Sequence, residues 1–161
     1  MVFLNDDESQ LLNLAFFYLK FRHRSKKEVR DYLLKKIKTT HWSPDSVEKI
    51  LERLEELKFI NDQDFVRWFV EQRNLMKPKS VYILKQELFQ FGIDKQIVDE
   101  YFENNIKDED EVVFNLLSRK WSRYSHLDKQ KRFEKAMSFL MRRGFSYDVI
   151  KKIINRLEEN S

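Results

Sequence analysis

The chain of 161 residues is 42% hydrophobic and 36% charged, with a formal net charge of +4, a composition that excludes general disorder. Two glycines and two prolines are too few for the turns of a β-rich protein and favour an all-helical fold. The absence of cysteine excludes disulfides and thiolate chemistry. Because the first eight residues show no export signal and no apolar run is long enough for a membrane span, we expect a cytoplasmic protein.

Signals for three helices open the chain. The first helix is expected to start near Asp6 or Asp7, and a capping box formed by Ser25 and Glu28 begins the second. Ser43-Pro44 begins the third, in the preferred order of a cap followed by a first-turn proline. Before it, Thr-Thr-His-Trp stands where a glycine would normally stop a helix, so this corner is expected to be longer and less regular.

Three further helices are expected in the middle of the chain. Asn61 or Asp62 caps the first of them, and Pro78 is expected in the first turn of the second. Gly92 supplies the left-handed residue that stops the second helix, and Asp94 caps the third. The inner face of the first of these helices is expected to carry Phe65, Trp68, Phe69 and Gln72.

The last part of the chain repeats this pattern. Asp108 begins a helix whose acidic start suits the helix dipole, Gly144 stops the next helix, and Ser146 caps the last one. The stretch from Leu88 aligns with that from Leu140, 52 residues later. We therefore predict an all-α protein of three tandem three-helix repeats, residues 1–58, 59–105 and 106–161, that form an elongated, curved array.

Positive charge is concentrated near both ends of the chain. Residues 20–38 hold nine Lys and Arg against two acidic residues, and residues 119–135 hold seven against two, whereas residues 45–73 and 94–111 are acidic. This segregation favours a polyanion or a large charged partner over a small neutral substrate. The alternative is that these charges only keep the outer faces of helices solvated.

The basic residues gather at the corner between the first and second helix of each expected repeat. Stacked regularly, such corners would form a line suited to phosphates or to an acidic filament groove, without sequence preference. Tyr124 and Trp42 are candidates for base stacking, with the alternative that Trp42 fills the irregular corner. The candidate binding residues are Arg22, Arg24, Lys26, Lys27, Arg30, Lys77, Lys79, Arg119, Lys120, Arg123, Lys129, Lys131 and Arg132.

Four motifs follow one another along the chain: R-S-K-K-E-V-R-D-Y-L from Arg24, F-I-N-D-Q-D-F from Phe59, Q-E-L-F-Q-F-G-I from Gln86 and R-G-F-S-Y-D-V-I from Arg143. In order and spacing they resemble the bacterial RecX regulatory proteins over nearly the whole chain. The chain departs from that family at Thr-Thr-His-Trp and at Lys-Pro-Lys-Ser, where a glycine is usual, which leaves the local helix ends open.

The resemblance implies a non-enzymatic regulator that binds along the groove of the RecA–single-stranded-DNA filament in DNA repair and the SOS response. Such a regulator inhibits or otherwise modulates the recombinase, ATPase and co-protease activities of the filament. The resemblance also implies weak, non-specific binding to single- or double-stranded DNA. We expect a monomer, and the choice between inhibition and stimulation stays open.

No catalytic, cofactor-binding or metal-binding residue is expected. His23, His41 and His126 are scattered singly, and both glycines are explained as helix stops, which leaves none for a phosphate-binding loop. The acidic run that starts at Asp108 is better explained by the helix dipole than by a metal.

Two other classes of protein are alternatives: a helix-turn-helix DNA-binding protein and a helical-repeat interaction scaffold. Against the first, the third helices of the first two repeats are acidic on their outer faces, unlike a recognition helix. A sequence-specific protein would bind duplex DNA alone, and a scaffold would ignore DNA.

Overall fold

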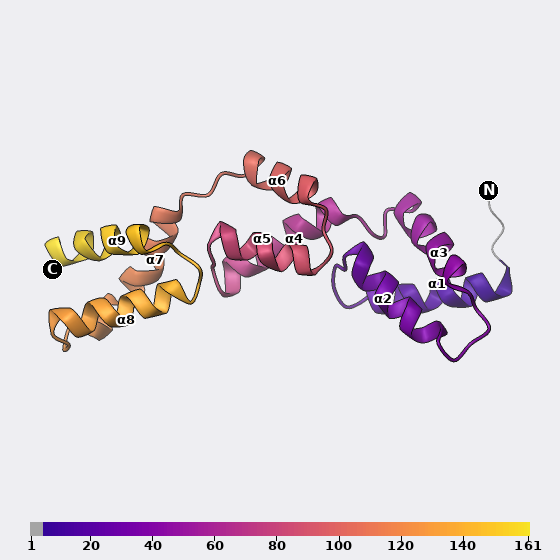
Figure 1. Cartoon of the computed structure of the whole chain (residues 1–161), viewed down its shortest axis with the longest axis horizontal. Coiled ribbons are helices and arrows are strands. Elements are labelled where there is room, and N and C mark those ends of the chain that lie inside the picture. Colours follow the sequence, from indigo (N-terminus) through magenta and orange to yellow (C-terminus); the bar gives the residue numbers. More distant parts are fainter. Residues whose placement is uncertain (1–4) are drawn as a thin grey trace. The chain divides into compact units, whose positions relative to one another are not determined.

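The computed structural model describes residues 5–161, so Met1–Leu4, part of the segment in which no export signal is expected, lie outside the described residues. Over residues 5–161 the chain forms nine α-helices and no strand, which confirms the all-helical prediction (Figure 1). The helices are α1 Asp6–Leu19, α2 Lys26–Ile37, α3 Pro44–Glu56, α4 Asp62–Met76, α5 Val81–Gln90, α6 Lys95–Asn104, α7 Glu109–Trp121, α8 Lys129–Met141 and α9 Tyr147–Glu159, with a 3₁₀ turn, η1, at Ser122–Tyr124. None of these described helices has both the length and the apolar character that a membrane crossing requires.

The chain divides into two compact units. Unit 1 consists of Met1–Val70 and Glu87–Tyr101, and unit 2 consists of Glu71–Gln86 and Phe102–Ser161. The division runs through α4, α5 and α6, so each unit holds one terminal set of three helices and parts of the central helices. The boundaries of the three repeats and the curvature of the array stay predictions.

The core of unit 1 is enclosed by α1, α2 and α3, whose fully buried side chains include Leu11, Leu33 and Ile50. Capping boxes begin α1 at Asn5 and α2 at Ser25, as the sequence predicts for Ser25. Trp42 is half-buried and packs against this core, so it fills the irregular corner between α2 and α3.

In unit 2, α7, α8 and α9 enclose a second core, in which Leu117, Leu140 and Ile150 are fully buried. Asp108 caps α7 and Ser146 caps α9, as predicted. The apolar stripe of α9 recurs at helical spacing, so one face of the helix enters the core and the other carries its charges.

Two predictions about the central helices are wrong. Gln72 is exposed, whereas Val66 and Val70 are buried. These two valines lie four residues apart, one position after Phe65 and Phe69, so all four side chains share the inner face of α4. Pro78 lies before α5 rather than in its first turn: the Oγ of Ser80 accepts the N–H of Ile83 at 3.2 Å and α5 begins at Val81.

Three helices end at a residue in the left-handed region. Gly92 has φ of 74° and Gly144 has φ of 85°, and both confirm the predicted helix stops. The third such residue is Lys58, with φ of 59°, which follows α3. A pattern search for glycine stops does not find it, although Phe59 donates its N–H to Leu54 as in the glycine stops.

A similar joint between helices occurs in both units, through the hydroxyl of Ser25 in unit 1 and through the backbone N–H of Ser80 in unit 2. In unit 1 the Oγ of Ser25 donates to the carbonyl of Phe91 at 2.7 Å, and the N–H of Lys26 donates to the Asp62 carboxylate at 2.9 Å. Phe91 is the residue before Gly92, and an added Cβ on that glycine would lie 2.7 Å from the Cβ of Lys27. This joint therefore requires glycine for space as well as for its backbone conformation.

In unit 2 the N–H of Ser80 donates to the carbonyl of Arg143 at 3.0 Å, and the N–H of Val81 donates to the Glu109 carboxylate at 2.7 Å. Arg143 is the residue before Gly144, whose added Cβ would lie 2.5 Å from the Oγ of Ser80. Each joint thus unites a serine at a helix start, the residue before a stop glycine and a carboxylate in the first turn of a later helix.

Candidate nucleic-acid interface

The five candidate cations at the corner between α1 and α2 all have acidic partners. Arg22 and Arg24 both contact the Oε1 of Glu28, at 2.5 and 3.7 Å. The guanidinium of Arg24 also lies 4.0 Å from the ring centroid of Tyr18. The remaining ion pairs of this corner are Lys26–Glu55 at 2.9 Å, Lys27–Asp31 at 2.6 Å and Arg30–Glu48 at 2.7 Å.

These pairs balance most of the positive charge at the first corner. The hydrogen bond between Arg30 and Glu48 raises the pKa of the guanidinium and lowers that of the carboxyl, so both stay charged at neutral pH. Because Glu28 also completes the capping box of α2, Arg22 and Arg24 hold the start of that helix. The first corner therefore presents little unpaired positive charge to a polyanion.

The second corner precedes α5. Lys77 is exposed, and Lys79 is half-buried with its carbonyl accepting a bond from the Nζ of Lys107 at 3.4 Å. Two lysines alone do not make a phosphate-binding surface, so this corner adds to such a site only together with others.

The third corner, between α7 and α8, forms a groove of about 470 Å³. It is lined by three residues that the sequence predicts as candidates for binding or base stacking: Lys120, Tyr124 and Lys131. Its other lining residues are Glu134, Lys135, Ser138, Phe139 and Arg142. The groove therefore combines four cations and two aromatic rings with a single carboxylate. We refer to it below as the basic groove.

Three contacts place cations of the basic groove. The Nζ of Lys120 lies 4.0 Å from the ring centroid of Phe139, and the Nζ of Lys131 lies 3.5 Å from the Asp128 carboxylate. Arg142 donates to the Oγ of Ser138 at 3.2 Å, which is a neutral partner. Most of the positive charge in the groove therefore has no carboxylate against it.

The other four candidate residues of the third corner lie outside the groove. Arg132 turns inward, with its Nη1 3.2 Å from Glu158 and its guanidinium 5.3 Å from the ring centroid of Trp121. Arg123 and Lys129 are exposed and, among residues 5–161, have no carboxylate within ion-pair distance. Arg119 lines a separate pocket.

Sequence reasoning missed Lys135, Ser138, Phe139 and Arg142 as site residues. They share one face of α8, because they follow Lys131 at steps of three and four residues. A search for cations at helical spacing would have found Lys135 and Arg142. A count of charge per stretch of sequence does not single them out.

The basic groove has the composition of a surface for single-stranded nucleic acid. Lysine and arginine neutralise phosphates without regard to sequence, and an aromatic ring such as that of Tyr124 offers a face to a base. The face of Phe139 is already occupied in part, because the Arg143 guanidinium lies 4.8 Å from its centroid in addition to Lys120. Tyr124 is therefore the better candidate for stacking.

Among residues 5–161, no three His, Asp or Glu side chains gather into a metal-binding group. His23 stacks on Trp68 with centroids 5.5 Å apart, and His41 contacts the Asp7 carboxylate at 2.9 Å and lowers its pKa. The acidic residues at the start of α7 have partners within unit 2: Glu109 accepts the N–H of Val81, and Asp110 pairs with Lys152.

Comparison with known proteins gives consistent matches. The family model described as RecX, third three-helix domain, matches residues 108–154. The regulatory protein RecX of Prosthecochloris aestuarii is 31% identical over 156 residues, which cover 97% of this chain and 99% of that protein. The regulatory protein RecX of Oceanobacillus iheyensis is 32% identical over 146 residues, and this chain spans about half of it, 52%. The crystal structure of RecX from Lactobacillus salivarius matches with a TM-score of 0.78 and 30% identity over 96% of this chain and 99% of that one.

Proposed function

This chain belongs to the RecX family of regulatory proteins, and from that membership we propose that it binds the RecA–single-stranded-DNA filament and restrains its activities. The observation that carries the proposal is the match to the Prosthecochloris protein over almost the full length of both chains. The protein acts by binding and not by catalysis. The name of its relatives, regulatory protein, supports this part of the proposal. It works as a monomer in the cytoplasm, and restrains recombination, ATP hydrolysis and co-protease activity.

The basic groove supplies the contact with DNA in this proposal. One carboxylate, that of Glu134, lines the groove beside its four cations, and Lys131 also pairs with Asp128 at the edge, whereas the cations of the first corner are all paired within unit 1. Affinity for naked DNA is weak and salt-sensitive, because the groove neutralises few phosphates. Tight binding requires the protein part of the filament.

The test is a comparison of two double variants that lose the same charge. Lys135→Gln with Arg142→Gln removes two cations of the basic groove. Lys35→Gln with Lys38→Gln removes two exposed lysines at the C-terminal end of α2, outside every candidate site. We expect the groove variant to bind preformed filaments about tenfold more weakly, and the control to change by less than about twofold. Fluorescence anisotropy with labelled filaments at low and high salt measures both.

Equal losses in the two double variants would mean that net charge, and not the groove, governs binding. Unchanged binding in the groove variant would remove the groove from the proposal and leave the family assignment intact. A protein that binds no filament of its cognate recombinase would contradict the proposed function itself.

A further inference from the structure

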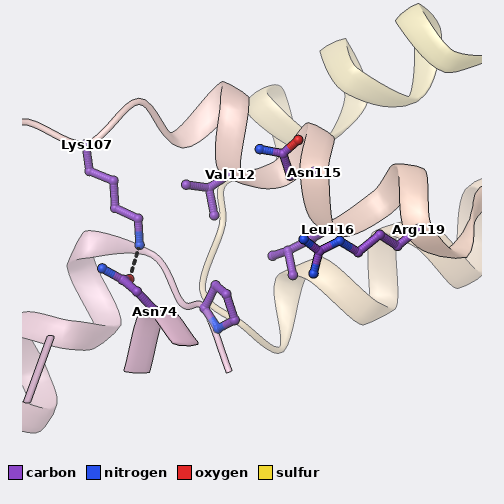
Figure 2. Close-up of a pocket in the computed structure, with 7 residues that line it drawn as sticks. Asn74, Lys107, Val112, Asn115, Leu116 and Arg119 are labelled. Carbon is purple, nitrogen blue, oxygen red and sulfur yellow. Dashed lines mark hydrogen bonds between the residues drawn. The ribbon is translucent and has the colours of Figure 1, made fainter. Parts of the chain in front are cut away.

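Unit 2 contains a second pocket that the proposed function does not use. It has a volume of about 320 Å³ and shares no lining residue with the basic groove. Figure 2 shows Lys107 and Asn74 on one side of it and Leu116 and Arg119 on the other, with Val112 between them. No acidic side chain lines the pocket.

Lys107 is the unusual residue of this pocket. Its Nζ donates to the Oδ1 of Asn74 at 2.7 Å (Figure 2). It also donates to the carbonyl of Lys79 at 3.4 Å, and both acceptors are neutral. Among residues 5–161, no carboxylate lies within ion-pair distance of it. Burial lowers the pKa of Lys107, against the more distant field of Glu109, so its charged form is less well solvated than that of an exposed lysine. A partly buried cation with neutral partners gains from an incoming carboxylate.

The other side of the pocket provides a second cation and an apolar wall. Arg119 is exposed and carries no ion pair among the described residues. Val112 and Leu116, one turn apart on α7, present aliphatic surface between the two cations (Figure 2). The carboxamides of Asn74 and Asn115 stand beside them and can both donate and accept, as a peptide backbone requires.

We propose that this pocket binds an extended acidic segment of a protein partner, with one aliphatic side chain against Val112 and Leu116 and flanking carboxylates on Lys107 and Arg119. Two cations separated by aliphatic surface match a peptide in which acidic residues flank an apolar one. Nucleic acid fits this pocket less well than it fits the basic groove, because no aromatic ring lines the pocket and it has half as many cations. The partner of this pocket need not be a recombinase.

The test uses a fluorescein-labelled peptide of aspartate, glutamate, leucine, glutamate and aspartate, with the full protein and fluorescence anisotropy as the readout. A second peptide carries serine in place of leucine, and so keeps the charge and loses the apolar anchor. The protein variants are Arg119→Gln and Lys107→Met, with Lys129→Gln as an exposed control of equal charge loss. Thermal melting of each variant reports whether it is folded. If Lys107→Met does not fold, Arg119→Gln still tests the pocket.

We expect the leucine peptide to bind, and each pocket variant to weaken that binding about tenfold. The serine peptide is expected to bind at least about fivefold more weakly, and Lys129→Gln to change the affinity by less than about twofold. Equal affinity for the two peptides, or an equal loss in Lys129→Gln, would overturn the proposal. An oligothymidylate that displaces the peptide, and whose own binding falls in Arg119→Gln, would make the pocket a nucleic-acid site and overturn it as well. These outcomes are independent of filament binding, so a failure here leaves the proposed function standing.

Discussion

The carboxylate of Asp62 is partly buried, and burial disfavours its charged form. It accepts the N–H of Lys26 at 2.9 Å, and burial raises its pKa above the usual 3.8 in spite of that bond. A group whose pKa is raised by folding contributes stability below its unfolded value, and this contribution is lost as the pH rises through the raised value. At neutral pH the charge of Asp62 therefore opposes folding.

Asp62→Asn keeps the acceptor oxygen and removes the charge. We expect its free energy of unfolding to exceed that of the parent at about pH 7, and the difference to shrink as the pH falls to 3.8 and below. Urea unfolding across this range measures it, with Asp64→Asn, an exposed carboxylate in the same helical turn, as the control. A variant less stable than the parent at neutral pH would show that the start of α4 favours the charged form.

The sequence identifies the cations of the first corner but not their partners. Arg30 pairs with Glu48 and Lys26 with Glu55, and both glutamates lie on α3, far along the chain from α2. Such pairing depends on which faces of two helices meet, and a count of charge per stretch carries no information about it. Local signals are more reliable at this scale, as the capping box of Ser25 and Glu28 shows.

At the scale of elements, the cap of α2 does two things at once. Ser25 is fully buried, its Oγ accepts the N–H of Glu28, and its hydroxyl donates to the carbonyl of Phe91. Ser43 also stands at a helix start, before Pro44, but makes no capping hydrogen bond. The two serines therefore form a matched pair for substitution.

Ser25→Ala is expected to lower the free energy of unfolding by about 2 kcal/mol, about half from the lost cap and half from the unsatisfied carbonyl of Phe91. Ser43→Ala is expected to change it by less than about 0.5 kcal/mol. Chemical denaturation of both variants under identical conditions gives the comparison. Similar losses in the two would mean that neither the cap nor the bond of Ser25 to Phe91 adds measurably to stability.

Helix positions are predicted well from the sequence where the signal is local. The stops at Gly92 and Gly144 and the caps at Asp108 and Ser146 are where the sequence places them. The basic groove is predicted in part, through Lys120, Tyr124 and Lys131. The remaining residues of the groove come from α8. They form a groove only because α8 lies beside the end of α7, and this packing cannot be predicted from sequence spacing.

At the scale of the whole molecule, the repeat visible in the sequence recurs in the contacts of both units. Ser25 and Ser80 each meet the residue before a stop glycine, and the helices that they begin each donate to a first-turn carboxylate, Asp62 or Glu109. Sequence spacing predicts that such units recur, but not which atoms join them. Hydrogen bonds of a similar kind thus accompany the recurring residue pattern at two places in the chain.

The most direct test of the proposed function is the rate of DNA-dependent ATP hydrolysis by the cognate RecA recombinase, measured on preformed filaments while this protein is added. We predict that the rate falls when the protein is present at well below one copy per recombinase subunit, since a regulator of filament growth or continuity acts on many subunits at once. The fall should be smaller in the double variant of the basic groove than in its charge-matched control. An unchanged rate with equimolar protein would contradict the account.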